Sequence, residues 1–167
     1  AELPAELSDA DRWILDRLNE VTRDVNELLD DYQFAKANEE MFHFVWDELC
    51  DWYLELSKTN FQPAVMGHVL DQVLRLLHPT MPFVTETLWT ALTGEETITF
   101  AQWPEAAPYD GAEAERRTAS RRIADVQKLV TEVRRFRSDQ GVKPSQKVPA
   151  RIDFAAADLA GLEDAVR

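Results

Sequence analysis

The chain has 167 residues, 45% of them hydrophobic and 10% aromatic, which predicts one folded domain with a sizeable core. It contains no run of about 18 apolar residues and no basic, apolar leader, so we expect neither a membrane span nor a secretory signal. One cysteine and three histidines exclude an internal disulfide and the usual zinc patterns. The composition therefore predicts a cytoplasmic protein without a metal.

The charge is unevenly distributed. A net charge of −13 argues against a nucleic-acid partner, because phosphate recognition depends on lysine and arginine. However, residues 116–151 hold 11 Lys and Arg against three Asp and Glu, whereas residues 1–56 hold 16 acids and four bases. The sequence thus predicts a basic element attached to an acidic body.

The first 56 residues predict two long helices. Ser8 and Asp11 form a capping-box-like pair at a helix start, and apolar residues then recur at steps of four and three up to Leu28. A second apolar stripe covers residues 34–56. Because the connection is short, we expect the two helices to pack antiparallel, with most of their acids on the solvent side.

Prolines and glycines delimit the next two helices. Pro63 suits the first turn of a third helix that is apolar over a wide arc. A proline-bracketed break ends at Pro82, and the helix that follows is expected to end at Gly94. Helical periodicity is absent from 95–111, which we interpret as a surface crossing with a short extended piece at 97–101.

The last long helix is predicted from about Ala112 to Gln140, with Gly141 as its stop. Its expected buried stripe consists of Ile123, Val126, Leu129, Val130, Val133 and Phe136. Beyond it, residues 147–154 alternate with a period near two and predict an edge strand, and a short helix is expected near residue 157.

These elements predict an all-α fold, an antiparallel bundle of about five helices over residues 1–141. Residues 142–167 would begin a small α/β appendage with a strand and a helix. The pattern stops in mid-course at Arg167, so we expect the chain to be cut from a longer protein.

Catalytic chemistry has little support in these residues. The five glycines are too far apart to form a phosphate-binding loop. Cys50 and His43 lie at a spacing at which a thiol and its base could meet on a helix, but a small packed or half-buried cysteine is the better interpretation. The other two histidines are isolated, so structural or solvent-exposed roles are expected for them.

Two features allow RNA binding. Six aromatic residues lie at helical spacing, and we expect most of them in the core and one or two exposed for base stacking: Phe42, Phe44, Trp46, Trp52, Tyr53 and Phe61. The arginines of the last helix are consistent equally with pairing to the acidic body and with contact to nucleic acid.

Four segments carry a resemblance to a known family. They are DRWIL at 11–15, FVWDELCDWYLELSK at 44–58, LHPTMPFVTETLW at 77–89 and VRRFRSDQGVKPS at 133–145. Together they resemble the anticodon-binding domain of bacterial valyl-tRNA synthetases over about residues 8–153. The proline-bracketed segment is shared by the valine, isoleucine and leucine enzymes, and here Thr87 replaces their usual second acid. The string CDWY at 50–53 is of the valine type.

The resemblance implies a helical domain that positions tRNA(Val) for ATP-dependent aminoacylation by catalytic and editing domains outside these residues. ATP and Mg²⁺ would belong to that parent enzyme, since neither class I signature occurs here. No catalytic residue, metal, DNA or membrane partner is expected in this segment. The expected tRNA-binding residues, mainly for backbone phosphates, are Arg134, Arg135, Arg137, Lys143, Ser145 and Lys147.

Three other interpretations stay open. The same domain of an isoleucine-type synthetase would share most of these segments. A protein-binding helical adaptor would expose a contiguous apolar patch. A freestanding enzyme would use Cys50 with His43.

Overall fold

The chain folds as an all-α bundle, as its hydrophobic periodicity predicts. The computed structural model describes residues 3–106, 113–143 and 146–148, and no strand occurs among them. In chain order the elements are α1 (Asp9–Asp30), α2 (Phe34–His43), the π-helix η1 (Phe44–Tyr53), α3 (Leu54–Leu56), the 3-10 turn η2 (Ser57–Thr59), α4 (Pro63–Leu77), α5 (Pro82–Thr93), the 3-10 turn η3 (Ile98–Phe100) and α6 (Glu113–Asp139). The predicted strand and helix after residue 146 lie almost wholly outside the described residues.

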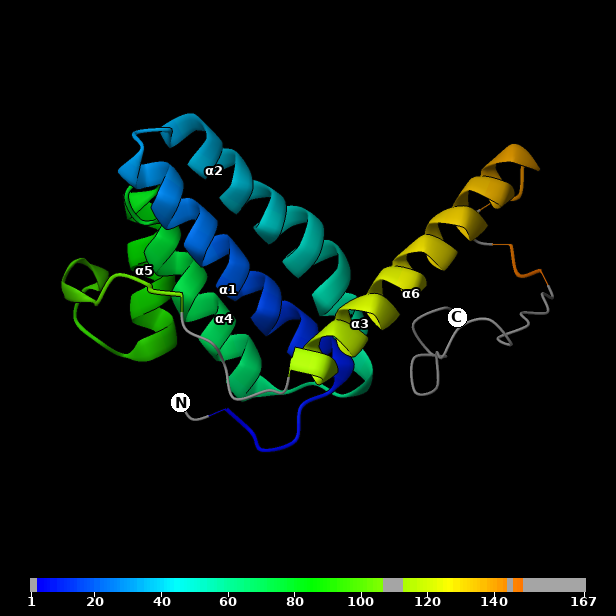
Figure 1. The fold of residues 1–167 in the computed structure, drawn as a ribbon, viewed down its shortest axis with the longest axis horizontal. Helices are drawn as coiled ribbons and strands as arrows, with labels where there is room; N and C mark the ends of the chain where they lie inside the picture. Colours follow the sequence, from blue (N-terminus) through cyan, green and yellow to red (C-terminus); the bar gives the residue numbers. More distant parts are fainter. Residues whose placement is uncertain (1–2, 107–112, 144–145, 149–167) are drawn as a thin grey trace.

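Helix α1 begins at the predicted capping box. The Asp11 backbone N–H donates to Ser8 Oγ at 3.1 Å, and the Ser8 N–H donates to the Asp11 carboxylate at 3.0 Å, so both free donors are satisfied. The apolar stripe of α1 faces α2 and α4, and its buried members include Ile14, Leu18, Val21 and Val25. Figure 1 shows α2 running antiparallel to α1, which confirms the predicted pairing.

One acid expected on the solvent side of α1 is instead fully buried. Asp11 accepts a hydrogen bond of 2.7 Å from the Tyr53 hydroxyl of η1. Because Asp11 belongs to the capping box of α1, its carboxylate stays at the end of the bundle, where Tyr53 of η1 contacts it.

The second predicted helix is one continuous helical rod from α2 to η2, but ten of its residues are π-helical. Two residues of the π-helix contact α1. Tyr53 donates to Asp11, and Glu48 accepts hydrogen bonds of 2.7 and 2.9 Å from Nε and Nη2 of Arg17. Residue spacing did not indicate this winding, because the apolar residues of 34–56 follow the three- and four-residue steps that are typical of an α-helix.

Helices α4 and α5 are joined by partly buried polar contacts. Trp89 Nε1 donates to Asp71 at 2.6 Å, and the His78 ring lies 2.8 Å from the Thr85 hydroxyl. Gly94 follows α5 with φ 77°, the left-handed conformation expected of a C-terminal glycine.

The extended piece predicted at 97–101 is wrong, because a 3-10 turn, η3, occupies its centre. The Thr97 side chain accepts the Thr99 N–H at 3.2 Å, which caps the turn. Ile98 is thereby buried in a small cluster with Leu74 and Trp89. A local cap and one buried side chain therefore override the β propensity of the threonines.

Helix α6 packs on α1 only through its first half. Ile123 and Val126 are fully buried, while Val133 and Phe136 are 39% and 65% exposed. The predicted buried stripe is therefore wrong at its C-terminal end. The physical reason is visible in Figure 1, where the last turns of α6 extend away from the bundle.

Candidate nucleic-acid interface

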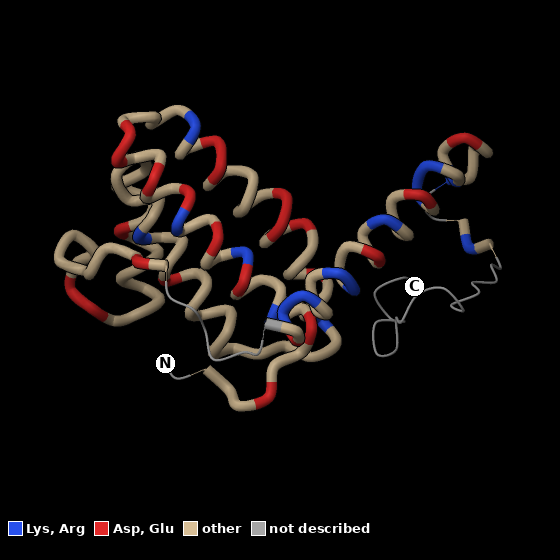
Figure 2. The backbone as a smooth tube through the Cα atoms, in the orientation of Figure 1, with Lys and Arg blue, Asp and Glu red and all other residues tan. Residues whose placement is uncertain are grey.

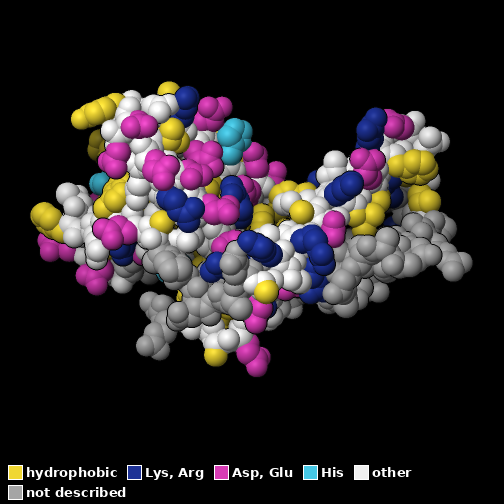
Figure 3. Space-filling model, in the orientation of Figure 1, with side chains coloured by type: hydrophobic (Ala, Val, Ile, Leu, Met, Phe, Trp, Pro, Cys, Tyr) yellow, Lys and Arg dark blue, Asp and Glu magenta, His cyan; other side chains and the backbone are white. Residues whose placement is uncertain are grey.

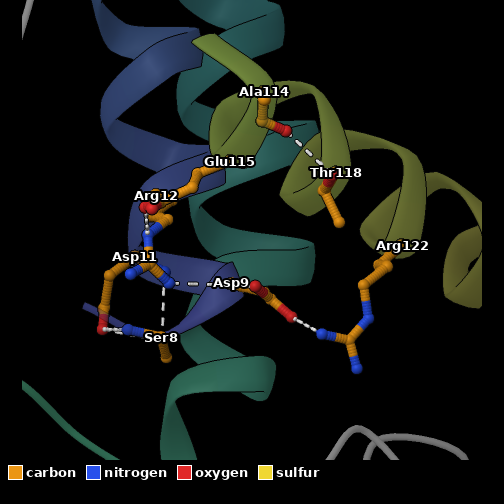
Figure 4. Close-up of polar contacts among 8 residues, drawn as sticks. All are labelled: Ser8, Asp9, Asp11, Arg12, Ala114, Glu115, Thr118 and Arg122. Atoms are coloured by element: carbon orange, nitrogen blue, oxygen red, sulfur yellow. Dashed lines mark hydrogen bonds and ion pairs between the residues drawn. The ribbon is translucent and has the colours of Figure 1, made fainter. Parts of the chain in front are cut away.

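The first half of α6 is held to α1 by charge as well as by apolar packing. Arg122 pairs with Asp9, and Arg12 of α1 lies 3.5 Å from Glu115 (Figure 4). Arg116 lies 3.4 Å from Asp16. Burial, followed by the charge of Glu20, raises the pKa of Asp16, and Arg116 opposes that rise. Part of the basic charge therefore pairs with the acidic body.

The second half of α6 and the turn after it carry basic residues that project from the body. We call this set the basic arm, and its described members are Arg134, Arg135, Arg137, Lys143 and Lys147. Arg134 and Arg135 are exposed, and no acidic side chain of the described residues pairs with them. Figures 2 and 3 show basic residues along α6 and acidic residues over α1 and α2. This separation favours contact with a polyanion at the arm.

The turn after α6 has a defined geometry. Gly141 has φ 65°, its N–H donates to the Ser138 carbonyl at 3.0 Å, and the Val142 N–H donates to the Arg137 carbonyl at 2.8 Å. This pattern is a Schellman motif, which ends the helix and reverses the chain. The reversal brings the backbone that follows back towards the last turn of α6.

Arg137 braces this turn. Its Nη2 donates to the carbonyls of Lys143 and Gln146, at 2.9 and 2.7 Å. The structure therefore brings four predicted residues close to one another, namely Arg134, Arg135, Arg137 and Lys143. Arg137 therefore has a structural role in holding the turn, in addition to its positive charge. Ser145 lies outside the described residues.

Arg134 also contacts the bundle. Its guanidinium carbon lies 6.0 Å from the centroid of the Trp52 ring, on η1, a cation–π distance. Sequence spacing gave no signal for this pair, because the two residues are far apart in the chain. This contact marks where the basic arm meets η1.

The aromatic set is less buried than predicted. Phe44 and Tyr53 are core residues and Trp52 is half-buried, but Phe42, Trp46 and Phe61 are exposed. Two of the exposed rings, Phe42 and Trp46, stack with an interplanar angle of 5°. Since half the set faces solvent, helical spacing overestimated how many of these aromatic residues lie in the core.

The surroundings of the stacked pair are acidic. His43 lies between Glu39 and Asp47, 3.9 and 2.7 Å from their carboxylates, and its hydrogen bond to Asp47 raises its pKa. Such a surface repels phosphates, so the stacked rings are a poorer RNA site than the basic arm.

Catalytic and metal-binding arrangements find no support in the described residues. Cys50 is exposed, which corrects the prediction of a packed or half-buried thiol; it lies four residues from the exposed Trp46 and Leu54, on a side of the rod that no described element covers. No group of three or more His, Cys, Asp or Glu within the described residues is arranged to hold a metal ion. None of the described helices is both long and apolar enough to cross a membrane.

Comparison with known proteins identifies the family. The model of the anticodon-binding domain of tRNA ligase matches residues 11–152. The chain is 63% identical to a valine–tRNA ligase of Corynebacterium efficiens over 98% of its own length and 19% of that protein. It is 52% identical to a valine–tRNA ligase of Streptomyces coelicolor over 98% of its own length and 19% of that protein. The chain therefore spans about a fifth of the length of these relatives. With its helical bundle and basic arm, the chain belongs to the family of anticodon-binding domains of tRNA ligases.

Proposed function

We propose that the chain is the anticodon-binding part of a valine–tRNA ligase and that it positions tRNA(Val) for aminoacylation elsewhere in the enzyme. The similarity to valine–tRNA ligases carries this proposal and favours valine over the isoleucine alternative. The parent enzyme would use ATP and Mg²⁺ in the cytoplasm, and we assign no residue of this chain to either group.

Within this function, the basic arm holds backbone phosphates. Arg134 and Arg135 are exposed and lack acidic partners among the described residues, so their charge is available to a polyanion. Their helix is anchored to α1 by Ile123 and Val126, which limits the conformational entropy lost on binding. Lys143 and Lys147 extend the same charge beyond the turn, and Ser145 would add a hydroxyl donor.

The test is the salt dependence of tRNA binding. We expect the chain to bind a tRNA(Val) transcript, with an affinity that falls between about 50 and 200 mM salt. The double substitution Arg134→Gln/Arg135→Gln should reduce the slope of log affinity against log salt by about two, because each arginine neutralises one phosphate.

Arg121→Gln is the matched control. Arg121 is an exposed arginine on the same helix but closer to the bundle, and its loss should leave the slope nearly unchanged. Absence of binding at low salt, or equal slopes for the double variant and the control, would contradict the role of the arm. A transcript with an altered anticodon then measures whether base-reading groups lie within the chain.

A further inference from the structure

Five large apolar side chains on α5 and at its N-cap are exposed, and no described element covers them. We call this set the α5 face, and it consists of Met81, Phe83, Val84, Leu88 and Leu92. These side chains are between 42% and 89% exposed. Three of them, Val84, Leu88 and Leu92, follow one another at four-residue steps and form a stripe.

The composition of α5 is that of a helix covered on both sides. Glu86 is its only charged residue in twelve. A surface helix normally has a polar outer face, and a helix that is apolar all round is normally buried. Here only the inner side is covered: Trp89 and Thr85 are buried and bonded to Asp71 within α4 and to His78 at its C-cap.

The rest of the ligase supplies the missing cover. The relatives are about five times longer than this chain, so most of the enzyme lies outside it. We propose that the α5 face docks against another part of the same ligase chain, an apolar surface rimmed by lysine or arginine. This inference rests on the proposed function, since it requires the parent enzyme.

The charges near the α5 face support that choice. Glu86, Glu95 and Glu96 lie along or just after α5, while the neighbouring Arg75 is engaged by Asp71 at 2.9 Å. An acidic rim disfavours RNA and favours a basic rim on the partner. In Figure 1, α5 and the arm end of α6 lie at opposite ends of the molecule. The ligase can therefore hold the domain at α5 while the basic arm holds tRNA.

Hydroxyl-radical footprinting of the full-length ligase without tRNA tests the proposal. Phe83 is 89% exposed in the domain itself, so an uncovered Phe83 would react nearly as fast as in the denatured enzyme. We expect Phe83 and Leu88 in the native ligase to react several-fold more slowly than in the denatured ligase, at every protein concentration. Reactivity near the denatured value would overturn the proposal.

Concentration and substitution identify the occupant. Protection that disappears on dilution would assign the face to a second copy and overturn docking within one chain. Leu88→Glu should restore the reactivity of Phe83, whereas Phe42→Glu, an equally solvent-facing change on α2, should leave it low. If Leu88→Glu leaves Phe83 protected, the proposal is wrong. Because tRNA is absent, failure of the tRNA-binding assay does not affect this result.

Discussion

At the residue scale, one buried hydrogen bond links the first turn of α1 to the last residue of η1. The Tyr53 hydroxyl donates to Asp11, and both side chains are fully buried. Tyr53→Phe leaves a carboxylate oxygen without this donor, so we expect a loss of about 1–3 kcal/mol in the free energy of unfolding. Urea denaturation at neutral pH measures it.

The same bond predicts a pH dependence. Burial, then the bond to Asp11, raises the pKa of Tyr53 above its ordinary value of 10.0. The folded state thus keeps a proton that the unfolded state loses above that pH, and stability declines as the solution becomes more alkaline. The Tyr53→Phe variant should not show this part of the alkaline decline in stability. Tyr32→Phe, at an exposed tyrosine, should change neither quantity, and equal behaviour of the two variants would contradict the assignment.

At the element scale, the helix ends show where local conformation matters. Gly94 ends α5 with φ 77°, a conformation that costs a residue with a Cβ about 1–2 kcal/mol. Gly94→Ala should therefore lower the unfolding free energy by about that amount. Thermal and urea unfolding of the variant measure the change.

Gly67→Ala provides the opposite control. Gly67 lies inside α4, and a Cβ added there meets no atom within 4 Å. Alanine should raise stability by about 0.5–1 kcal/mol, because it restricts the unfolded chain. If both glycine-to-alanine variants changed the free energy of unfolding in the same direction, the backbone conformation of the glycine would not explain the effect.

At the scale of the whole molecule, α6 is anchored at one end and projects at the other. Ile123 is fully buried against the core formed with α1, so Ile123→Ala should cost about 2–5 kcal/mol. Val133→Ala, where the side chain is 39% exposed, should stay within about 0.5 kcal/mol. Denaturant titration of both variants compares them, and a large loss at Val133 would mean that the arm packs on the body.

The sequence by itself determined the helices and their order. The Ser8 and Asp11 cap, Pro63 at the start of α4 and the left-handed Gly94 and Gly141 are local signals, because neighbouring residues alone decide the backbone there. The basic stretch on the last helix is also evident from the chain, and with it four of the six predicted tRNA-binding residues lie close together.

Only the tertiary structure decided which side chains are covered. Helical spacing placed Phe136 in a buried stripe and most of the six aromatic residues in the core. A side chain is buried only where another element reaches it, and α6 leaves the bundle before Phe136. The Tyr53 bond to Asp11 and the stacking of Arg134 on Trp52 join residues far apart in the chain. Local periodicity carries no information on such distant contacts, since they depend on how the helices pack.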